Sequence, residues 1–339
     1  MMSTQPNGTM TTLANTKLTP CIEWEFLQRL FAFRPPYMWV IFVLGFIENL
    51  FVISVFVLHK SRCTVTEIYL GNMAAADLIF VSSLPFRALD ISNNLYWPFG
   101  GFMCSTVYSL FQFNLYSSIY LLMMVSIGRY LALVKPMSTG RLRRPWWAKL
   151  ICGIIWMFAA ALSVPNALFR KVVFIKNFNI TRCVIDRSSN NWFIAANIII
   201  NVLGFLLPLV VIAFCTSQMI HVLRNITKKQ FKNVNKQRKA TWLVLSVFLV
   251  FIVCWLPYNI TLFINTLVRA NVFLPCMVKN VNRTVNSISV YLVLTNSCIN
   301  PIIYSMLGNH FRQKAREVFR RLLCKGSDRQ RSSIPTDES

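Results

Sequence analysis

Seven long apolar runs constrain the fold of this chain more than any other feature. A membrane-spanning helix needs roughly 20 mostly apolar residues to cross the ~30 Å hydrocarbon core of a bilayer. Only 14% of the residues are charged, whereas about 25% is usual in soluble domains. The sequence therefore predicts an all-α membrane protein, a bundle of seven transmembrane helices. The predicted spans are residues 37–58, 67–91, 102–134, 147–169, 192–223, 240–268 and 284–307.

The excess of positive charge predicts how the chain is oriented. Lys and Arg outnumber Asp and Glu by 35 to 11, which gives a formal net charge of +24. Cytoplasmic loops retain Lys and Arg. With the C-terminus inside, 22 basic residues fall on the cytoplasmic side and 12 on the other. A soluble nucleic-acid binder would instead collect them on one folded face. We therefore predict a multi-pass plasma-membrane protein with its N-terminus outside, its C-terminus in the cytoplasm and no nucleic-acid partner.

Four parts follow from this arrangement. They are an extracellular tail (1–36), the helix bundle (37–308), an amphipathic interfacial helix (309–324) and a disordered cytoplasmic tail (325–339). Apolar residues recur at helical spacing between Phe311 and Leu322, with arginines between them, as in helices that lie on a membrane surface. Cys324 is the predicted palmitoylation site, which would add a second anchoring signal.

The outer side carries predicted modification sites. Sequons there predict glycans at Asn7, Asn179 and Asn282. The outer cysteines, which face an oxidising compartment, are Cys21, Cys104, Cys183 and Cys276. Four cysteines allow three pairings, and the sequence alone does not choose among them.

Asp77 lies in the middle of the second predicted span, where lipid does not solvate its charge. One interpretation is a structural hub of hydrogen bonds. The other is a site for a sodium ion, the only cofactor that the sequence suggests. The residues available to complete that site are Asn114, Ser118, Asn296 and Asn300.

The order of several motifs resembles rhodopsin-like G-protein-coupled receptors over residues 37–323. The motifs are Asn49, the run from Leu70 to Asp77, Trp97, Cys104, Arg129-Tyr130, Trp156, Pro208, Cys254-Trp255-Leu256-Pro257 and Asn300-Pro301-Ile302-Ile303-Tyr304. A closer resemblance, to the kinin (bradykinin) receptors, rests on the stretches 66–72, 129–135, 204–208 and 296–301, and on Glu48 before Asn49.

The resemblance implies a cell-surface peptide receptor that signals through heterotrimeric G proteins and phospholipase C, with arrestin and a receptor kinase as further partners. It also implies that Cys104 pairs with Cys183, and Cys21 with Cys276. The residues expected to change contacts on activation are Gly128, Arg129, Tyr130, Pro208, Phe251, Trp255, Pro257, Asn300, Pro301 and Tyr304. An enzyme is not expected, because the three histidines are scattered and no metal-ligand cluster or phosphate loop occurs. A transporter is not expected either, because the halves show no repeat.

The outer face departs from the kinin-receptor pattern. Kinin receptors carry acidic residues at the outer ends of helices six and seven, where this chain has Asn265 and Arg283. Basic residues outnumber acidic ones on this outer face. Their charges are either solvated and uninformative, or they attract an anionic ligand, such as a peptide carboxylate, an acidic peptide or an anionic lipid. The predicted ligand-binding residues are Arg87, Tyr108, Phe111, Gln112, Trp255, Tyr258, Asn259, Leu262, Asn265, Arg283, Asn286 and Tyr291.

The inner face departs from the family pattern as well. Rhodopsin-like receptors usually carry Asp or Glu immediately before Arg129, and this chain has Gly128. Loss of that carboxylate predicts raised signalling without ligand. The alternative is a scavenger that binds ligand without activating a G protein.

Overall fold

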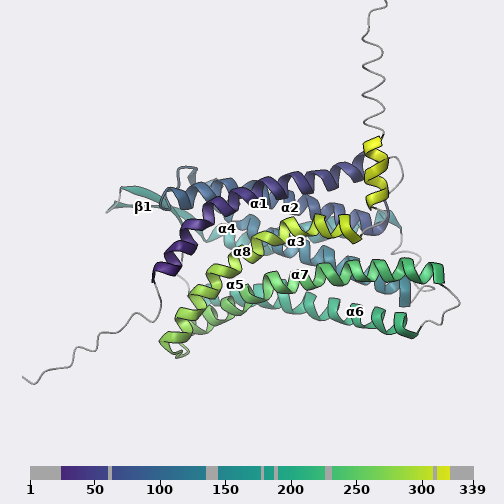
Figure 1. The fold of residues 1–339 in the computed structure, drawn as a ribbon. Helices are drawn as coiled ribbons and strands as arrows, with labels where there is room; N and C mark the ends of the chain where they lie inside the picture. Colours follow the sequence, from purple (N-terminus) through teal and green to yellow (C-terminus); the bar gives the residue numbers. More distant parts are fainter. Residues whose placement is uncertain are drawn as a thin grey trace, which may run out of the picture.

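The structure, a computed structural model, describes residues 24–59, 63–134, 144–176, 179–186, 190–225, 231–307 and 311–320. Long helices lie side by side along one axis (Figure 1). The helices are α1 (Trp24–Leu58), α2 (Val65–Ser92), α3 (Gly100–Val134), α4 (Pro145–Leu168), α5 (Asn190–Asn201), η2 (Val202–Leu206), α6 (Leu207–Asn225), α7 (Phe231–Arg269) and α8 (Cys276–Leu307). The seven predicted spans correspond to α1, α2, α3, α4, the continuous run α5–η2–α6, α7 and α8, which confirms the predicted all-α fold.

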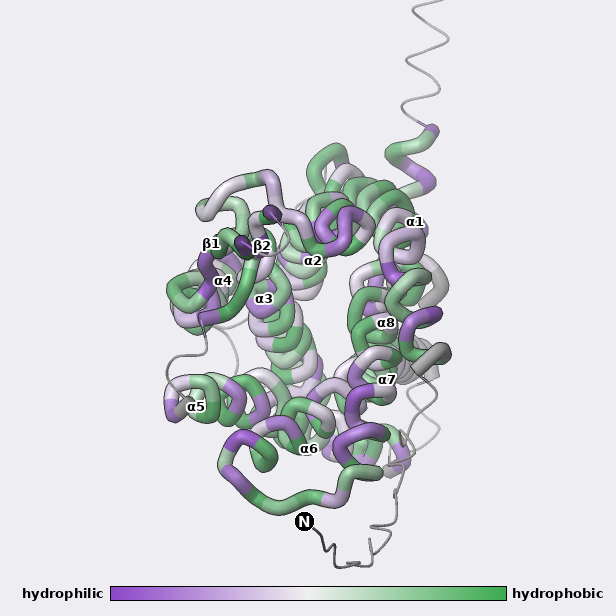
Figure 2. Tube along the Cα trace, turned by 90° about the vertical axis from the view of Figure 1, so that its left-hand side faces the viewer, coloured by the Kyte–Doolittle hydropathy of each residue, from purple (hydrophilic) through white to green (hydrophobic). Residues whose placement is uncertain are grey.

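The helices differ in how apolar they are (Figure 2). Among the described residues, six helical spans are long and apolar enough to cross a membrane by length and composition, and α8 is not one of them. Several polar residues of α8 are buried inside the bundle, including Ser289, Ser297 and Asn300. We infer that α8 is less apolar because it supplies polar groups to the interior.

Helix α1 begins earlier than the sequence predicts. The apolar run starts at residue 37, but α1 starts at Trp24 and continues through Pro35 and Pro36. Proline lacks a backbone N–H and usually interrupts a helix. Here the first turns are held by α8, because the Tyr291 hydroxyl donates a hydrogen bond to the carbonyl of Leu30. The segment 24–36, predicted as part of the tail, is therefore helical in its described residues.

A β-hairpin covers one end of the bundle. Strands β1 (Arg170–Ile175) and β2 (Ile180–Ile185) pair antiparallel, with Val172 opposite Cys183. The disulfide from Cys183 to Cys104, with Cα atoms 5.7 Å apart, fixes the hairpin to the start of α3. Trp97 adds a second attachment, because its backbone N–H donates to the carbonyl of Thr181 at 2.8 Å. We call this end of the bundle the hairpin end.

The opposite end carries a short helix over residues 311–320, drawn in yellow and lying across the bundle axis in Figure 1. It packs on the end of α1, where the rings of Phe56 and Phe311 are 5.7 Å apart. We call this the tail end. The described residues of the predicted interfacial helix 309–324 are therefore helical.

Two glycines allow close contacts inside the bundle. A Cβ atom at Gly45 would lie 2.9 Å from Cγ1 of Val81. At Gly204, in the π-helical turn η2, it would lie 3.2 Å from side-chain atoms of Leu115 and Tyr116. Pro208 follows this turn, and its ring would clash with the carbonyl four residues earlier in a regular helix. The wider turn relieves that clash.

Alanine at two glycines should have opposite effects on stability. Nothing lies within 4 Å of a Cβ atom at Gly128, and a glycine inside a helix costs about 1 kcal/mol relative to alanine. Gly128→Ala should therefore raise the melting temperature in detergent by about 2–4 °C. Gly45→Ala should lower it, because overpacking costs about 1–3 kcal/mol. Thermal unfolding of both variants checks this; a fall for Gly128→Ala would contradict it.

Candidate functional site

A cavity of about 450 Å³ opens beneath the hairpin. Its size falls in the range of small-molecule and cofactor sites. Residues of α2, α3, α4, α5, α7, α8 and the hairpin line it. Eight of the predicted ligand-binding residues are among them, namely Arg87, Tyr108, Phe111, Gln112, Tyr258, Leu262, Asn265 and Asn286. The structure brings these eight together, and their role in binding stays a prediction.

The other four predicted residues lie elsewhere. Trp255 is buried below the cavity, with its ring centre 5.7 Å from that of Phe111. Asn259 is buried and donates a hydrogen bond to the carbonyl of Trp255 at 2.9 Å. Arg283 is exposed at the hairpin end of α8. Tyr291 faces α1 rather than the cavity.

The cavity wall also contains residues that sequence reasoning did not place there. Arg170 comes from β1, Asn166 from α4, and Trp192 and Phe193 from α5. Arg170 was not among the predicted ligand-binding residues. The signal that could have placed it is its position at the start of a β-branched run, from which the hairpin folds back over the bundle.

Two guanidinium groups pack on one ring of the cavity wall. The Arg170 guanidinium lies 3.9 Å from the ring centre of Tyr108, and that of Arg87 lies 5.1 Å from it. Both are within the range of cation–π attraction. The Tyr108 hydroxyl in turn donates to the buried carboxylate of Asp90 at 2.5 Å. Burial lowers the pKa of Arg170 to about 10, so it stays charged at neutral pH.

Arg87 and Arg170 form a cationic wall of the cavity, and some of their N–H groups have no hydrogen-bond acceptor in the described residues. Buried Nε of Arg170 and buried Nε and Nη1 of Arg87 form no hydrogen bond within the described part of the chain. Asp186 also lines the cavity, but its carboxylate accepts from Lys171 at 2.6 Å. Buried N–H groups without acceptors are costly. The wall is therefore suited to an anionic group that accepts from both arginines.

An aromatic stack leads from the cavity toward the middle of the bundle. Trp255 stacks on Phe251 with ring centres 6.0 Å apart, and Phe251 on Phe205 at 6.1 Å. Phe205 belongs to η2, next to Pro208. Packed aromatic residues of α7 thus join the cavity to the irregular turn, and a shift of one ring requires its neighbours to repack.

The carboxylate of Asp77 is the centre of a polar network. Asp77 is fully buried. Its Oδ1 accepts from Asn114 at 2.8 Å and from Ser297 at 3.0 Å, and its Oδ2 accepts from Asn300 at 3.1 Å. Ser118 joins through a 3.4 Å bond from Asn114. Asn296 is buried on the same helix as Ser297. Within the described residues no cationic side chain pairs with Asp77, so the hydrogen bonds to its carboxylate are what offset its burial.

Comparison with known proteins gives a consistent result. The family model described as "7 transmembrane receptor (rhodopsin family)" matches residues 48–304. The chain is 48% identical to the B2 bradykinin receptor of Homo sapiens over 320 residues, which cover 94% of this chain and 81% of that receptor. It is 47% identical to the B2 bradykinin receptor of Oryctolagus cuniculus over 302 residues, covering 88% and 82% of the two chains. It is 35% identical to the B1 bradykinin receptor of Homo sapiens over 301 residues, covering 88% and 84%.

The chain belongs to the rhodopsin family of receptors, among the bradykinin receptors. Several of the motif residues can be located in the structure. Pro257 and Pro301 lie inside α7 and α8. Tyr130 packs against Phe214 of α6, with ring centres 6.0 Å apart. The side chain of Tyr304 lies outside the described part of the receptor.

The disulfide between Cys104 and Cys183 is confirmed. Cys276 is exposed at the start of α8, but Cys21 lies outside the described residues, as do Asn7 and Cys324. Asn179 is exposed in the turn of the hairpin, which is compatible with a glycan.

The prediction for Asn282 needs correction. Its side chain is buried in α8 and donates to Oδ1 of Asn265 at 2.9 Å. A glycan on this nitrogen would break that contact and would not fit inside the bundle. Asn282 lies inside α8 on the side that faces α7, which the sequence alone did not show.

Removing the confirmed disulfide should abolish ligand binding at the cell surface. The bond closes a loop across 79 residues, and loss of a native disulfide commonly costs about 2–5 kcal/mol. Cys104→Ala, Cys183→Ala and the double variant should bind equally poorly, because all three lack the same bond. Cys21→Ala should have the smaller effect on folding. Binding assays with surface-labelled receptor measure this, and full affinity of Cys104→Ala would contradict it.

Proposed function

We propose that this receptor lies in the plasma membrane with its hairpin end outside, binds a kinin-type peptide in the cavity, and activates a heterotrimeric G protein at its tail end. Homology to bradykinin receptors supports the peptide and the G protein. The predominance of Lys and Arg in the loops of the tail end supports the orientation. Phospholipase C with calcium release is the proposed signalling route.

The observation that carries the proposal about the ligand is that the two arginines of the cavity wall keep N–H groups without hydrogen-bond acceptors in the described residues. A free peptide C-terminus is a carboxylate, which accepts charge-assisted hydrogen bonds from guanidinium groups. Arg87 and Arg170 offer buried N–H groups without acceptors in the described structure. We therefore assign these two arginines to the C-terminal carboxylate of the peptide.

The cationic end of a kinin has no matching acid here. Asn265 lines the cavity but accepts a hydrogen bond from Asn282, and Arg283 is exposed and positively charged. Neither residue neutralises an N-terminal arginine. The proposed ligand is thus a kinin-type peptide recognised mainly by its carboxyl end. The same wall makes a more acidic peptide or an anionic lipid the second candidate.

Regulation at the tail end is part of the proposal. Serine and threonine residues of the tail 325–339 would gain negative charge on phosphorylation by a receptor kinase, and arrestin would recognise that charge. A scavenger would bind the same ligands without G-protein activation, so nucleotide exchange on purified G protein separates it from a signalling receptor.

Replacing either arginine should weaken binding of a peptide acid more than of its amide. A hydrogen bond to a charged group contributes about 1.5–3 kcal/mol, which is roughly a 10- to 100-fold change in affinity. Bradykinin with a free C-terminus should lose that much affinity for Arg87→Gln and Arg170→Gln. Its C-terminal amide, already weaker, should lose little more.

The control is Lys279→Gln, because Lys279 is exposed on α8 and outside the cavity lining. It should leave both affinities unchanged. Equal losses for acid and amide in the arginine variants would show that the arginines support the cavity wall but do not hold the carboxylate.

Sodium is proposed to bind at Asp77 when the receptor is at rest. Sodium would offset the buried charge of Asp77, and repacking of α8 against α3 on activation would displace it. Agonist affinity should then fall as sodium replaces a bulky cation at constant ionic strength. Asp77→Asn should remove this dependence. Radioligand competition measures it, and an unchanged sodium dependence in Asp77→Asn would exclude the site.

A further inference from the structure

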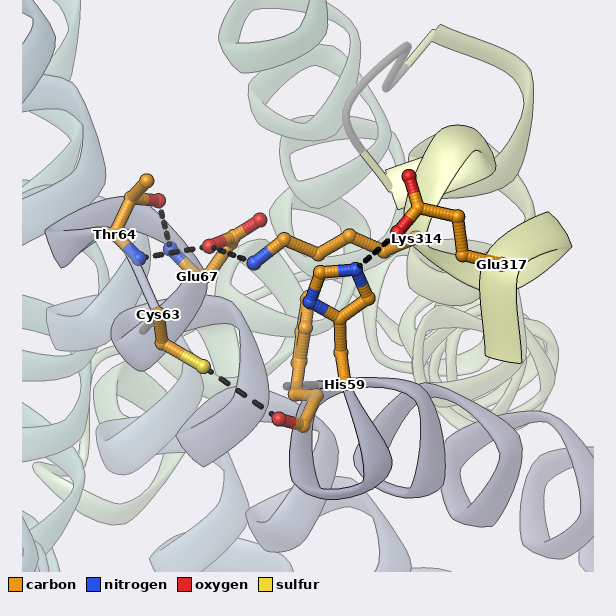
Figure 3. Close-up of polar contacts among 7 residues, drawn as sticks. His59, Cys63, Thr64, Glu67, Lys314 and Glu317 are labelled. Atoms are coloured by element: carbon orange, nitrogen blue, oxygen red, sulfur yellow. Dashed lines mark hydrogen bonds and ion pairs between the residues drawn. The ribbon is translucent and has the colours of Figure 1, made fainter. Parts of the chain in front are cut away.

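The helix 311–320 is held against the tail ends of α1 and α2 by one of its faces. Nζ of Lys314 donates to Oε2 of Glu67 at 2.9 Å, and both side chains are largely shielded from solvent, with 10% and 8% exposed (Figure 3). The same Glu67 oxygen accepts from the backbone N–H of Thr64 at 2.7 Å, in the capping box that begins α2. Because the capping box fixes Glu67, its pair with Lys314 sets how the helix 311–320 is rotated about its own axis.

Apolar contacts and a second polar pair support the same orientation. Phe311 and Val318 are buried, and the Phe311 ring packs on α1. Oε2 of Glu317 lies 2.9 Å from Nε2 of His59, just after the end of α1 (Figure 3). Residues three and four apart share a face of a helix, so positions 311, 314 and 318 form the face that meets the bundle. The opposite face is turned away from the bundle.

Three arginines occupy the face that is turned away. Arg312, Arg316 and Arg320 are spaced four residues apart, and all three are exposed. Together with Gln313 and Glu317 they line a groove of about 520 Å³, which we call the arginine groove. Glu317 is the one acid in this described lining, so three positive charges face a single negative charge. The groove therefore attracts anions.

The spacing of the arginines suits a ligand with several phosphates. A rise of 1.5 Å per residue puts successive arginine Cα atoms about 6 Å apart and the outer two about 12 Å apart. Guanidinium groups bind phosphate oxygens through paired, charge-assisted hydrogen bonds. A headgroup with phosphates at several positions engages all three side chains without bringing their like charges together.

Apolar side chains beside the arginine groove favour a lipid over a soluble phosphate. Phe319, on the same helix, is exposed. Phe51 lies in the apolar span of α1, is also exposed, and has its ring centre 6.0 Å from that of Phe311. The apolar outer surface of α1 is thus continuous with the helix 311–320. Exposed aromatic residues beside a row of basic ones are typical of helices that lie on a membrane surface.

We propose that the arginine groove binds the headgroup of a phosphoinositide in the cytoplasmic leaflet, with the acyl chains of the lipid beside α1. Arg312, Arg316 and Arg320 pair with its phosphates. The buried pair of Glu67 and Lys314 presents these arginines to the headgroup, because it fixes the rotation of the helix. The site is separate from the cavity beneath the hairpin.

Binding of a short-chain fluorescent phosphatidylinositol bisphosphate to the purified full-length receptor, followed by fluorescence anisotropy, tests the site. Arg312→Gln, Arg316→Gln and Arg320→Gln should each weaken binding about fivefold, the effect of one basic residue at an anionic membrane surface. The triple variant should lose roughly 100-fold. Glutamine has nearly the helix propensity of arginine, and an unchanged affinity for bradykinin checks that the variants are folded. Parent-like lipid binding by the folded triple variant would overturn the proposal.

Lys149→Gln is the matched control. Lys149 is exposed at the tail end of α4 and lines a separate groove beside α1 and α2. Its replacement removes one positive charge from the same end of the receptor. Lipid binding should stay close to that of the parent. A loss equal to that of the arginine variants would mean that overall surface charge, and not the arginine groove, attracts the lipid.

Two further probes identify the occupant. Phosphatidylserine, with a single phosphate, should bind more weakly and should lose less on each arginine substitution. Inositol trisphosphate, the same headgroup without acyl chains, should also bind more weakly than the lipid. Equal affinity for headgroup and lipid would assign the groove to a soluble phosphate and overturn the proposal.

The tail of the receptor is the competing occupant. If the parent bound the lipid only after phosphatase treatment, the phosphorylated tail 325–339 would be the ligand of the arginine groove, and the lipid proposal would be wrong. None of these measurements needs a G protein. Failure of the proposed coupling therefore leaves the inference standing, and failure of the inference leaves the coupling standing.

Discussion

The exclusion of water from the membrane interior is the constraint on which the rest of this structure depends. In hydrocarbon each backbone polar group must bond within the protein, which restricts a spanning chain of this kind to helices. Each buried charge must likewise find its partner in the protein. The described spans meet the first requirement by being helical, and the buried charges meet the second to different degrees at different depths.

How completely each buried charged group is satisfied by partners in the protein differs with its predicted role. Asp77, in the middle, accepts three hydrogen bonds from α3 and α8. Near the hairpin, Arg87 and Arg170 share one aromatic ring and retain N–H groups without acceptors in the described residues. At the tail end Arg129 is half-buried and forms no hydrogen bond or ion pair within the described residues. The incompletely satisfied groups thus lie at the two ends, where ligand and G protein are proposed to bind.

The sequence predicted what depends on local pattern and missed what depends on tertiary contacts. Apolar runs located every span, and the resemblance paired Cys104 with Cys183 correctly. The helical turns before Pro35 were missed because contacts with α8, not local propensity, hold them. The hairpin was missed because its strands are short, so Arg170 was not placed in the cavity. Asn282 was expected at the surface because a sequon carries no information on which way a helix faces. Lys314 donates a hydrogen bond to Glu67 at 2.9 Å, but the two residues are far apart in the chain and no pattern linked them.

The pairing of two cations on the ring of Tyr108 has a consequence for the empty receptor. Like charges held close together repel, and here the buried carboxylate of Asp90, hydrogen-bonded to the same tyrosine, offsets only part of that repulsion. The repulsion between the two guanidinium groups therefore destabilises the cavity wall. An arriving anion gains affinity from its new contacts and also from the repulsion that it relieves. Long-range electrostatic attraction raises the rate at which an anionic ligand associates with the cavity, and dissolved ions screen that attraction. The ionic strength of the surrounding fluid therefore affects how fast the ligand binds.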